Sequence, residues 1–257
     1  MLGRLRDRVE RRLPDQLADL ETIVNIESGS YTKAGVDQVA TWMAGRLGAL
    51  GASVERHPNA ELGDTVVATL EGAADGPTIV LIGHADTVFD TGYLARRPFE
   101  IEGDTILGPG VSDMKSGLLA GLYAIDAVSA TSEAGALPFG RLVYIVNPDE
   151  EIGSPASGSL IAERSRGADA AFVMEAARAN GDIVSARKGL MHLRATLQGR
   201  SAHAGVEPEK GRSATLEAAH KAIALDGLNG RWPGVTVNVG EIKGGTRPNI
   251  VAGEAIM

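Results

Sequence analysis

The chain has 257 residues, 44% hydrophobic and 23% charged, which is the composition of an ordinary globular protein with one or two domains. Its formal charge of −8, from 25 basic and 33 acidic residues, argues against a nucleic-acid partner, because nucleic-acid binding normally needs a basic surface. The absence of cysteine excludes disulfides and thiolate metal sites, and no apolar run reaches the roughly 20 residues that a membrane span needs.

The first two-thirds of the chain alternate between helical and strand-like segments. Residues 4–26 predict an amphipathic helix that Pro14 can divide in two. This mixed-charge start lacks the pattern of a secretory signal, so we expect a cytoplasmic protein without membrane contact. Helices are also predicted over residues 36–50, 116–130 and 159–165. A strand is predicted over 65–70, and buried strands over 78–82, 142–146 and 170–174. This alternation predicts an α/β fold with a mostly parallel sheet and helices on both faces.

The pattern changes after about residue 185. Residues 191–198 alternate strictly between apolar and polar side chains, which predicts a strand with one solvent-exposed face. A helix over residues 213–225, an alternating strand over 235–242 and the start of another strand at 250 follow. We therefore predict one domain over residues 1–184 and a smaller α+β domain over residues 185–257.

Acidic side chains and one histidine follow the ends of three predicted strands. In an open parallel sheet, functional groups gather beyond the carboxyl ends of the strands, so we expect these side chains to meet there. Asp113 arrives separately, in a glycine-rich loop before the helix at 116–130. The side chains at the strand ends are His84, Asp86, Glu150, Glu151 and Glu175.

The spacing of these residues suits a metal centre. Residues two apart in an extended segment point the same way, so Asp86 can hydrogen-bond His84 and raise its basicity toward a metal. Glu150 and Glu151 point in different directions, so one can bind a metal while the other carries a proton. The acidic run 149–151 is expected to repel itself at a dry strand end without a cation. Each residue alone is also explained as an ordinary loop residue, and only the set favours zinc, cobalt or manganese ligation.

Four motifs in this sequence resemble those of the M20 metallopeptidases, and especially the glutamate carboxypeptidase group. They are GHADTVFD at 83–90, GPGVSDMKSG at 108–117, NPDEEIGS at 147–154 and GRSAHAG at 199–205. The resemblance covers essentially the whole chain. It implies a zinc-exopeptidase-like catalytic domain over residues 1–184, and an incomplete, ferredoxin-like lid domain over residues 185–257 through which the protein forms a homodimer.

The resemblance also implies two divalent metal ions, zinc in the first place, with cobalt or manganese as alternatives. His84 and Glu175 would bind the first ion, Asp113 would bridge both ions, and Glu151 would bind the second. Asp86 would orient His84.

Three further residues receive roles from the resemblance. Glu150 would be the general base. His203, in the lid domain, would reach toward the partner's active site and steady the oxyanion. Asn249 matches a position that contacts substrate in relatives.

The function implied by the resemblance is metal-dependent hydrolysis of a peptide or amide bond next to a free carboxylate, carboxypeptidase-like, by a metal-bound hydroxide. An N-acyl or N-carbamoyl amino-acid amidohydrolase of the same fold is the alternative. The family's final histidine ligand of the second ion has no counterpart up to Met257, so the chain is expected to be truncated at its C-terminus. A non-catalytic fragment with an incomplete second metal site, acting mainly in dimerisation, is the alternative from another class.

Overall fold

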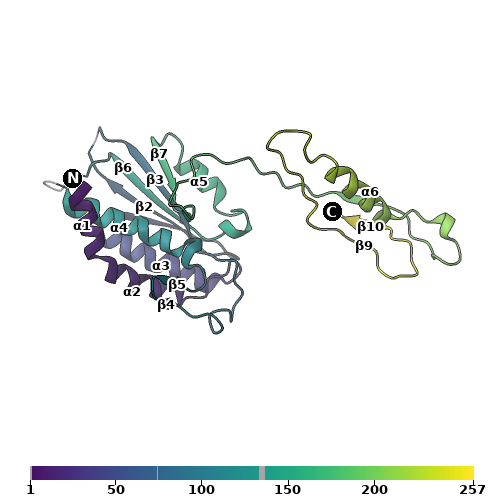
Figure 1. The fold of residues 1–257 in the computed structure, drawn as a ribbon, viewed down its shortest axis with the longest axis horizontal. Coiled ribbons are helices and arrows are strands. Elements are labelled where there is room, and N and C mark those ends of the chain that lie inside the picture. Colours follow the sequence, from purple (N-terminus) through teal and green to yellow (C-terminus); the bar gives the residue numbers. More distant parts are fainter. Residues whose placement is uncertain (1, 74, 133–136) are drawn as a thin grey trace. The chain divides into compact units, whose positions relative to one another are not determined.

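A computed structural model describes residues 2–73, 75–132 and 137–257 of the chain. The chain divides into two compact units, the first ending at Asp182 and the second spanning Ile183–Met257 (Figure 1). Each unit has its own sheet and its own helices, and each is described by itself.

A five-stranded sheet in the order β1-β2-β6-β3-β7 forms the centre of the first unit. β3 pairs in parallel with both β6 and β7, whereas β2 pairs antiparallel with β1 and β6, so four of the five strands run in one direction. The predicted α/β fold with a mostly parallel sheet is confirmed. The strands are β1 (Ser53–His57), β2 (Thr65–Glu71), β3 (Thr78–His84), β6 (Arg141–Asn147) and β7 (Ala170–Val173).

Helices cover both faces of this sheet, as predicted. Alternate residues of a strand point to opposite faces, so Tyr144 of β6 packs with the helices on one face while its neighbour Val143 packs on the other. The first face carries α2, α3 and α4 (Figure 1), and Leu160 of α5 packs on the second. The helices are α1 (Leu2–Arg11), α2 (Leu13–Val24), α3 (Lys33–Ala49), α4 (Ser116–Thr131) and α5 (Gly158–Arg164).

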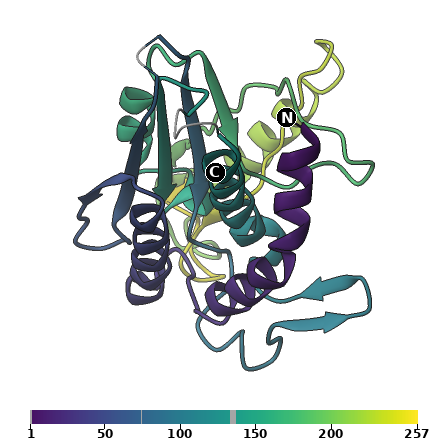
Figure 2. The same ribbon diagram turned by 90° about the vertical axis from the view of Figure 1, so that its left-hand side faces the viewer.

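Pro14 divides the predicted N-terminal helix in two, as expected. It lies in the first turn of α2, where the missing backbone N–H has no intrahelical partner to lose. The sequence pattern did not predict β1, nor the antiparallel hairpin of β4 (Glu100–Glu102) and β5 (Thr105–Leu107), which projects from the rest of the first unit (Figure 2). These short strands are mostly exposed, so they lack the apolar runs that identify buried strands.

The expectation that β7 is a buried strand is wrong. Phe172 and Val173 are 53% and 60% exposed. β7 lies at the edge of the described sheet and has β3 as its single neighbour, so its apolar residues gain less cover than those of the inner strands.

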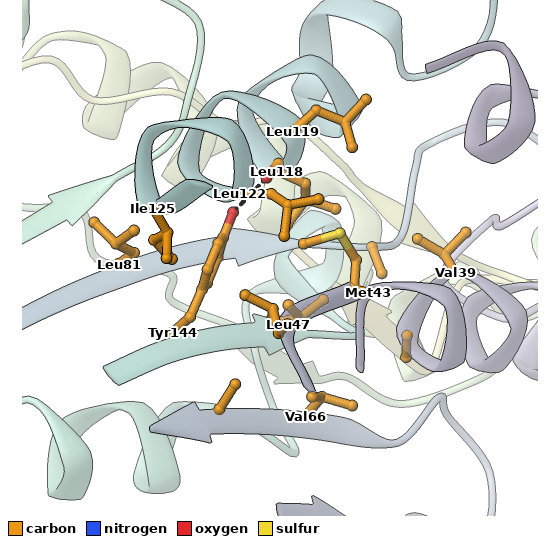
Figure 3. Close-up of a cluster of buried hydrophobic side chains, with 14 of the residues drawn as sticks. Val39, Met43, Leu47, Val66, Leu81, Leu118, Leu119, Leu122, Ile125 and Tyr144 are labelled. Carbon is orange, nitrogen blue, oxygen red and sulfur yellow. Dashed lines mark hydrogen bonds between the residues drawn. The ribbon is translucent and has the colours of Figure 1, made fainter. Parts of the chain in front are cut away.

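The main core lies between the sheet and helices α2 to α4. Figure 3 shows Tyr144 of β6 reaching from the sheet toward α4, among Leu81, Leu122 and Ile125. The Tyr144 hydroxyl donates a hydrogen bond to the backbone oxygen of Leu118 at 2.7 Å. Because Tyr144 is fully buried, this bond satisfies a polar group that water cannot reach, and it fixes the distance between β6 and α4.

Replacing Tyr144 by Phe is expected to lower the free energy of unfolding of the first unit by about 0.5–1.5 kcal/mol, the usual contribution of one buried hydrogen bond. Tyr31→Phe is the matched control, since it deletes the same hydroxyl from a side chain that is 80% exposed. Urea denaturation of both variants measures the difference. Equal stability of the two variants would show that the bond to Leu118 adds nothing.

The second unit contains a three-stranded antiparallel sheet in the order β8-β10-β9, with α6 (Ala214–Asp226) packed against it. The Ser213 side chain caps α6 by accepting a hydrogen bond from Leu216 N at 3.2 Å, which satisfies one of the free N–H groups of the first turn. Ala218 of α6 packs on Leu197 and Ala255 of the sheet. The strands are β8 (Thr196–Gln198), β9 (Lys243–Gly244) and β10 (Glu254–Ile256).

Two of the predicted strands differ in the second unit. Of residues 191–198, only Thr196–Gln198 form a strand, and residues 235–242 form none. A segment with alternating apolar and polar residues forms a strand only where a neighbouring strand supplies backbone hydrogen bonds. In this structure Leu193, on the apolar face of the predicted strand, is 82% exposed. Among the described residues, no helix combines the length and the apolar character that crossing a membrane requires.

Candidate metal centre

Three neighbouring parallel strands deliver the candidate ligands to one edge of the sheet. His84 is the last residue of β3 and lies opposite Asn147, the last residue of β6. Glu150 opens a short 3-10 turn three residues after β6, and Glu175 follows β7 by two residues. Since β6, β3 and β7 are adjacent and parallel, their carboxyl ends meet, and the side chains that follow them converge.

His84 is buried and its two ring nitrogens face different partners. Nδ1 lies 2.9 Å from the backbone oxygen of Asp86 and 3.3 Å from its Oδ1. These acceptors hold the ring proton on Nδ1 and leave Nε2 to face the candidate ligands. Nε2 lies 3.1 Å from Asp113 Oδ1, 3.3 Å from Glu175 Oε1 and 4.0 Å from Glu150 Oε2.

The charges around His84 are strongly unbalanced. Burial lowers the pKa of His84, but hydrogen bonds and charge interactions with Asp86 and Glu175 outweigh it and raise the pKa to about 11. Burial, followed by the charge of Asp113, raises the pKa of Glu151 to about 7, and burial also raises the pKa of Glu150. The single positive charge of the protonated His84 is thus surrounded by several carboxylates that repel one another, so the site carries more negative than positive charge.

The donor set fits divalent metal ions. Ligand atoms of His84, Glu150 and Glu175 lie within 4.8 Å of one another, as do those of His84, Asp113 and Glu151. Imidazole nitrogen with carboxylate oxygens suits zinc and similar ions, whose charge would remove the imbalance. The structure brings together all six residues of the first unit that the sequence identifies as site residues, since Asp86 contacts His84 directly.

Asp86 connects the histidine to the turn that carries the two glutamates. It is fully buried, and its carboxylate accepts hydrogen bonds from Glu150 N at 3.1 Å and from Glu151 N at 3.2 Å. Its Oδ2 also accepts a hydrogen bond from the Ser30 hydroxyl at 2.7 Å. Nothing in the sequence around Ser30 indicated this contact, which joins residues 56 positions apart.

Asp149 does not belong to the repelling acidic run that the sequence predicted. Its buried carboxylate accepts hydrogen bonds from the Ser157 hydroxyl at 2.5 Å and from Ala156 N at 2.6 Å. Asp149 therefore closes the loop behind Glu150 and Glu151 and does not belong to either group of candidate metal ligands.

The loop that carries Asp113 is held in an unusual backbone conformation. Gly110 has a φ of +75°, and a Cβ there would lie 2.7 Å from Thr87 Cγ2, so both backbone and space require glycine. The peptide bond between Asp113 and Met114 is cis. Lys115 is buried, which lowers its pKa to about 7, and its ammonium donates to the backbone oxygen of Ile26 at 2.9 Å.

His203 and Asn249 lie together in the second unit. His203 pairs with Ile250 in an isolated bridge, and the N–H of Ala204 donates to the backbone oxygen of Asn249 at 2.9 Å. Both His203 and Asn249 are exposed. Their predicted roles toward substrate remain predictions.

Comparison with known proteins supports the sequence motifs. Residues 185–257 match the M20 peptidase dimerisation domain. Carboxypeptidase G2 of Pseudomonas sp. (strain RS-16) is 31% identical over 95% of this chain and 59% of its own length. A succinyl-diaminopimelate desuccinylase of Leptothrix cholodnii is 30% identical over 84% of this chain and 60% of its own length. The chain thus spans about three-fifths of these relatives.

Solved structures share the fold. An aminopeptidase PepT from Bacillus cereus has a TM-score of 0.65 at 24% identity, covering 94% of this chain and 64% of its own. An M20 family metallo-carboxypeptidase from Sulfolobus solfataricus has a TM-score of 0.65 at 17% identity, covering 94% and 69%. Residues 185–257 thus match the M20 peptidase dimerisation domain, and the chain as a whole is similar in sequence to carboxypeptidase G2 and shares the fold of an M20 family metallo-carboxypeptidase.

Proposed function

We propose that this chain carries the catalytic centre of a metal-dependent hydrolase that cleaves a peptide or amide bond next to a free carboxylate. The observation that supports the proposal most strongly is the arrangement around His84 Nε2. Three carboxylates, each from a different segment, approach within 4.0 Å of this one nitrogen. A structural histidine needs one or two acceptors, whereas this number of acids suits bound cations.

Each residue of the centre receives a distinct task in this proposal. His84, Asp113, Glu151 and Glu175 would hold two divalent ions, with Asp113 shared between them. Zinc is the first choice, and cobalt or manganese would suit the same donors. When bound, such ions polarise an amide carbonyl and lower the pKa of a water molecule.

Glu150 is assigned the proton transfer. Its carboxylate lies beside the ligands, yet its side chain is 51% exposed and so stays open to substrate and water. Burial and the surrounding acids raise its pKa, which brings a carboxylate closer to the pH at which it can both accept and release a proton. Glu150 would take a proton from the attacking water and deliver it to the leaving amine.

The acyl-amino-acid amidohydrolases are the second candidate. The relatives include enzymes named succinyl-diaminopimelate desuccinylase and acetylornithine deacetylase, besides carboxypeptidase G2. The name desuccinylase or deacetylase implies release of an acyl group from an amine, which breaks an amide bond as a carboxypeptidase does. The match of residues 185–257 to a dimerisation domain supports a homodimer formed through the second unit.

A substrate screen with metal analysis tests the proposal. The chain, loaded with zinc, cobalt or manganese, is offered peptidyl and N-acyl amino acids, each beside the same compound with its carboxylate converted to a carboxamide. We expect hydrolysis of the free carboxylates and little of the carboxamides. Bound metal without hydrolysis of any member of the series would contradict the proposed activity.

A further inference from the structure

We propose that Ser30 is a positioning residue of the metal centre, which fixes the carboxylate of Asp86 and through it His84 and the Glu150–Glu151 turn. This inference rests on the proposed function, because it concerns how the chain prepares its ligands for the ion. Ser30 lies outside the four motifs that carry the family resemblance.

The contacts of Asp86 give Ser30 its importance. The two oxygens of this carboxylate contact four groups, which are the His84 ring, two backbone N–H groups and the Ser30 hydroxyl. Oδ1 faces His84 Nδ1 at 3.3 Å and Glu150 N at 3.1 Å, while Oδ2 accepts from Glu151 N at 3.2 Å and from the Ser30 hydroxyl at 2.7 Å. The Ser30 bond is the shortest of these contacts. It therefore holds Oδ2 in place and sets the plane in which Oδ1 meets the histidine.

The backbone around Ser30 makes this donor rigid. Ser30 N donates to Thr87 O at 3.2 Å, and Thr87 N donates to Ser28 O at 2.8 Å, so the segment is fastened to the residue that follows Asp86. A Cβ on Gly29 would lie only 2.4 Å from Phe89 O, which shows how closely the two segments approach. The hydroxyl and its acceptor are thus held by the same pair of backbone segments.

Lys115 links the loop that carries Asp113 to the same segment by a hydrogen bond. Its ammonium donates to Ile26 O, four residues before Ser30, and Lys115 itself lies two residues after Asp113. The segment 26–30 therefore contacts both the loop of Asp113 and the carboxylate of Asp86. Among these contacts, only the Ser30 hydroxyl reaches a group that touches His84 directly.

Ser28 supplies a matched control. It lies two residues away on the same segment and is buried like Ser30, with 2% against 6% exposed. Its hydroxyl has no hydrogen-bond partner among the described residues, whereas the Ser30 hydroxyl donates to Asp86. Ser28→Ala and Ser30→Ala therefore remove the same atom from the same segment, and only the second removes a contact of Asp86.

Zinc affinity, measured by competition with a chromophoric chelator, tests the proposal. Loss of a group that orients a metal ligand typically weakens metal binding by about 10- to 100-fold, and we expect this for Ser30→Ala. Ser28→Ala should bind zinc as the unaltered chain does, and Ser30→Thr, which keeps a hydroxyl, should recover most of the affinity. The cobalt(II) absorption spectrum should change in Ser30→Ala alone, because it reports the geometry of the ligands. Circular dichroism of the metal-free variants confirms that each is folded.

Two results would overturn the role of Ser30. One is zinc affinity and a cobalt spectrum in Ser30→Ala equal to those of the unaltered chain. The other is an equal loss in Ser28→Ala, which would assign the effect to packing of the segment. Failure of the unaltered chain to bind zinc or cobalt would instead remove the proposed function itself, so the two failures are distinguishable.

Discussion

Replacing Glu150 by Gln is expected to lower kcat for amide hydrolysis by about 10²- to 10⁴-fold while the bound metal stays unchanged. Glutamine keeps the size of the side chain and can still accept a hydrogen bond, but it cannot take a proton from water. The backbone N–H of residue 150, which donates to Asp86, is unaffected by the substitution. Steady-state kinetics with metal content per chain, measured on the same sample, separates proton transfer from ligation.

Two variants make this result interpretable. Glu71→Gln is the control for the chemical change, because Glu71 pairs with Arg141 at the start of β6, the opposite end of the strand from Glu150, and should leave kcat unchanged. Glu151→Gln should lose metal together with activity, since Glu151 groups with His84 and Asp113. If Glu150→Gln also loses its metal, Glu150 is a ligand, and the proton carrier must be sought elsewhere.

The parts of the fold that could be predicted are those in which local pattern and burial agree. Residues 78–82 and 142–146 are apolar because both faces of β3 and β6 are covered, and the structure places strands there. The strand predicted over residues 235–242 is wrong. A strand also needs a neighbouring strand to pair with, and the sequence pattern of one segment does not show whether such a neighbour is present. β1 was missed for the opposite reason: its polar sequence is held by pairing with β2.

The candidate metal ligands could be predicted because the order and direction of the strands determine where these residues lie. Once three strands are parallel neighbours, the residues after them must meet, and His84 and Glu150 are identifiable without knowledge of distances. Ser30 and Asp149 were not identified because their importance depends on hydrogen bonds that exist only in the folded chain. Ser30 donates to Asp86, and Asp149 accepts from Ala156 N and from the Ser157 hydroxyl. A serine in a loop and an acid beside two others look the same in the sequence whether they serve the site or solvent.

Replacing His84 by Ala is expected to weaken zinc binding by roughly a hundredfold or more. Four-ligand zinc sites bind with about 10–16 kcal/mol, so one ligand contributes about 3 kcal/mol, and His84 Nε2 belongs to both groups of ligand atoms. The substitution also leaves the buried carboxylate of Asp86 without its imidazole partner, although its three hydrogen-bond donors remain. His220→Ala, on an exposed position of α6, is the control for histidine loss and should bind zinc normally.

Thermal unfolding with and without zinc gives an independent measure of the same variant. An ion that binds only the folded chain stabilises it by about 2.7 kcal/mol at a concentration of 100 Kd, so zinc should raise the Tm of the unaltered chain and of His220→Ala. At the same zinc concentration the Tm of His84→Ala should rise little, because zinc binds the folded form of this variant only weakly. A full zinc-induced shift in His84→Ala would mean that the carboxylates hold the ion alone. The nitrogen-and-oxygen donor set from which zinc is inferred would then be wrong, and an oxygen-only site for a harder cation would take its place.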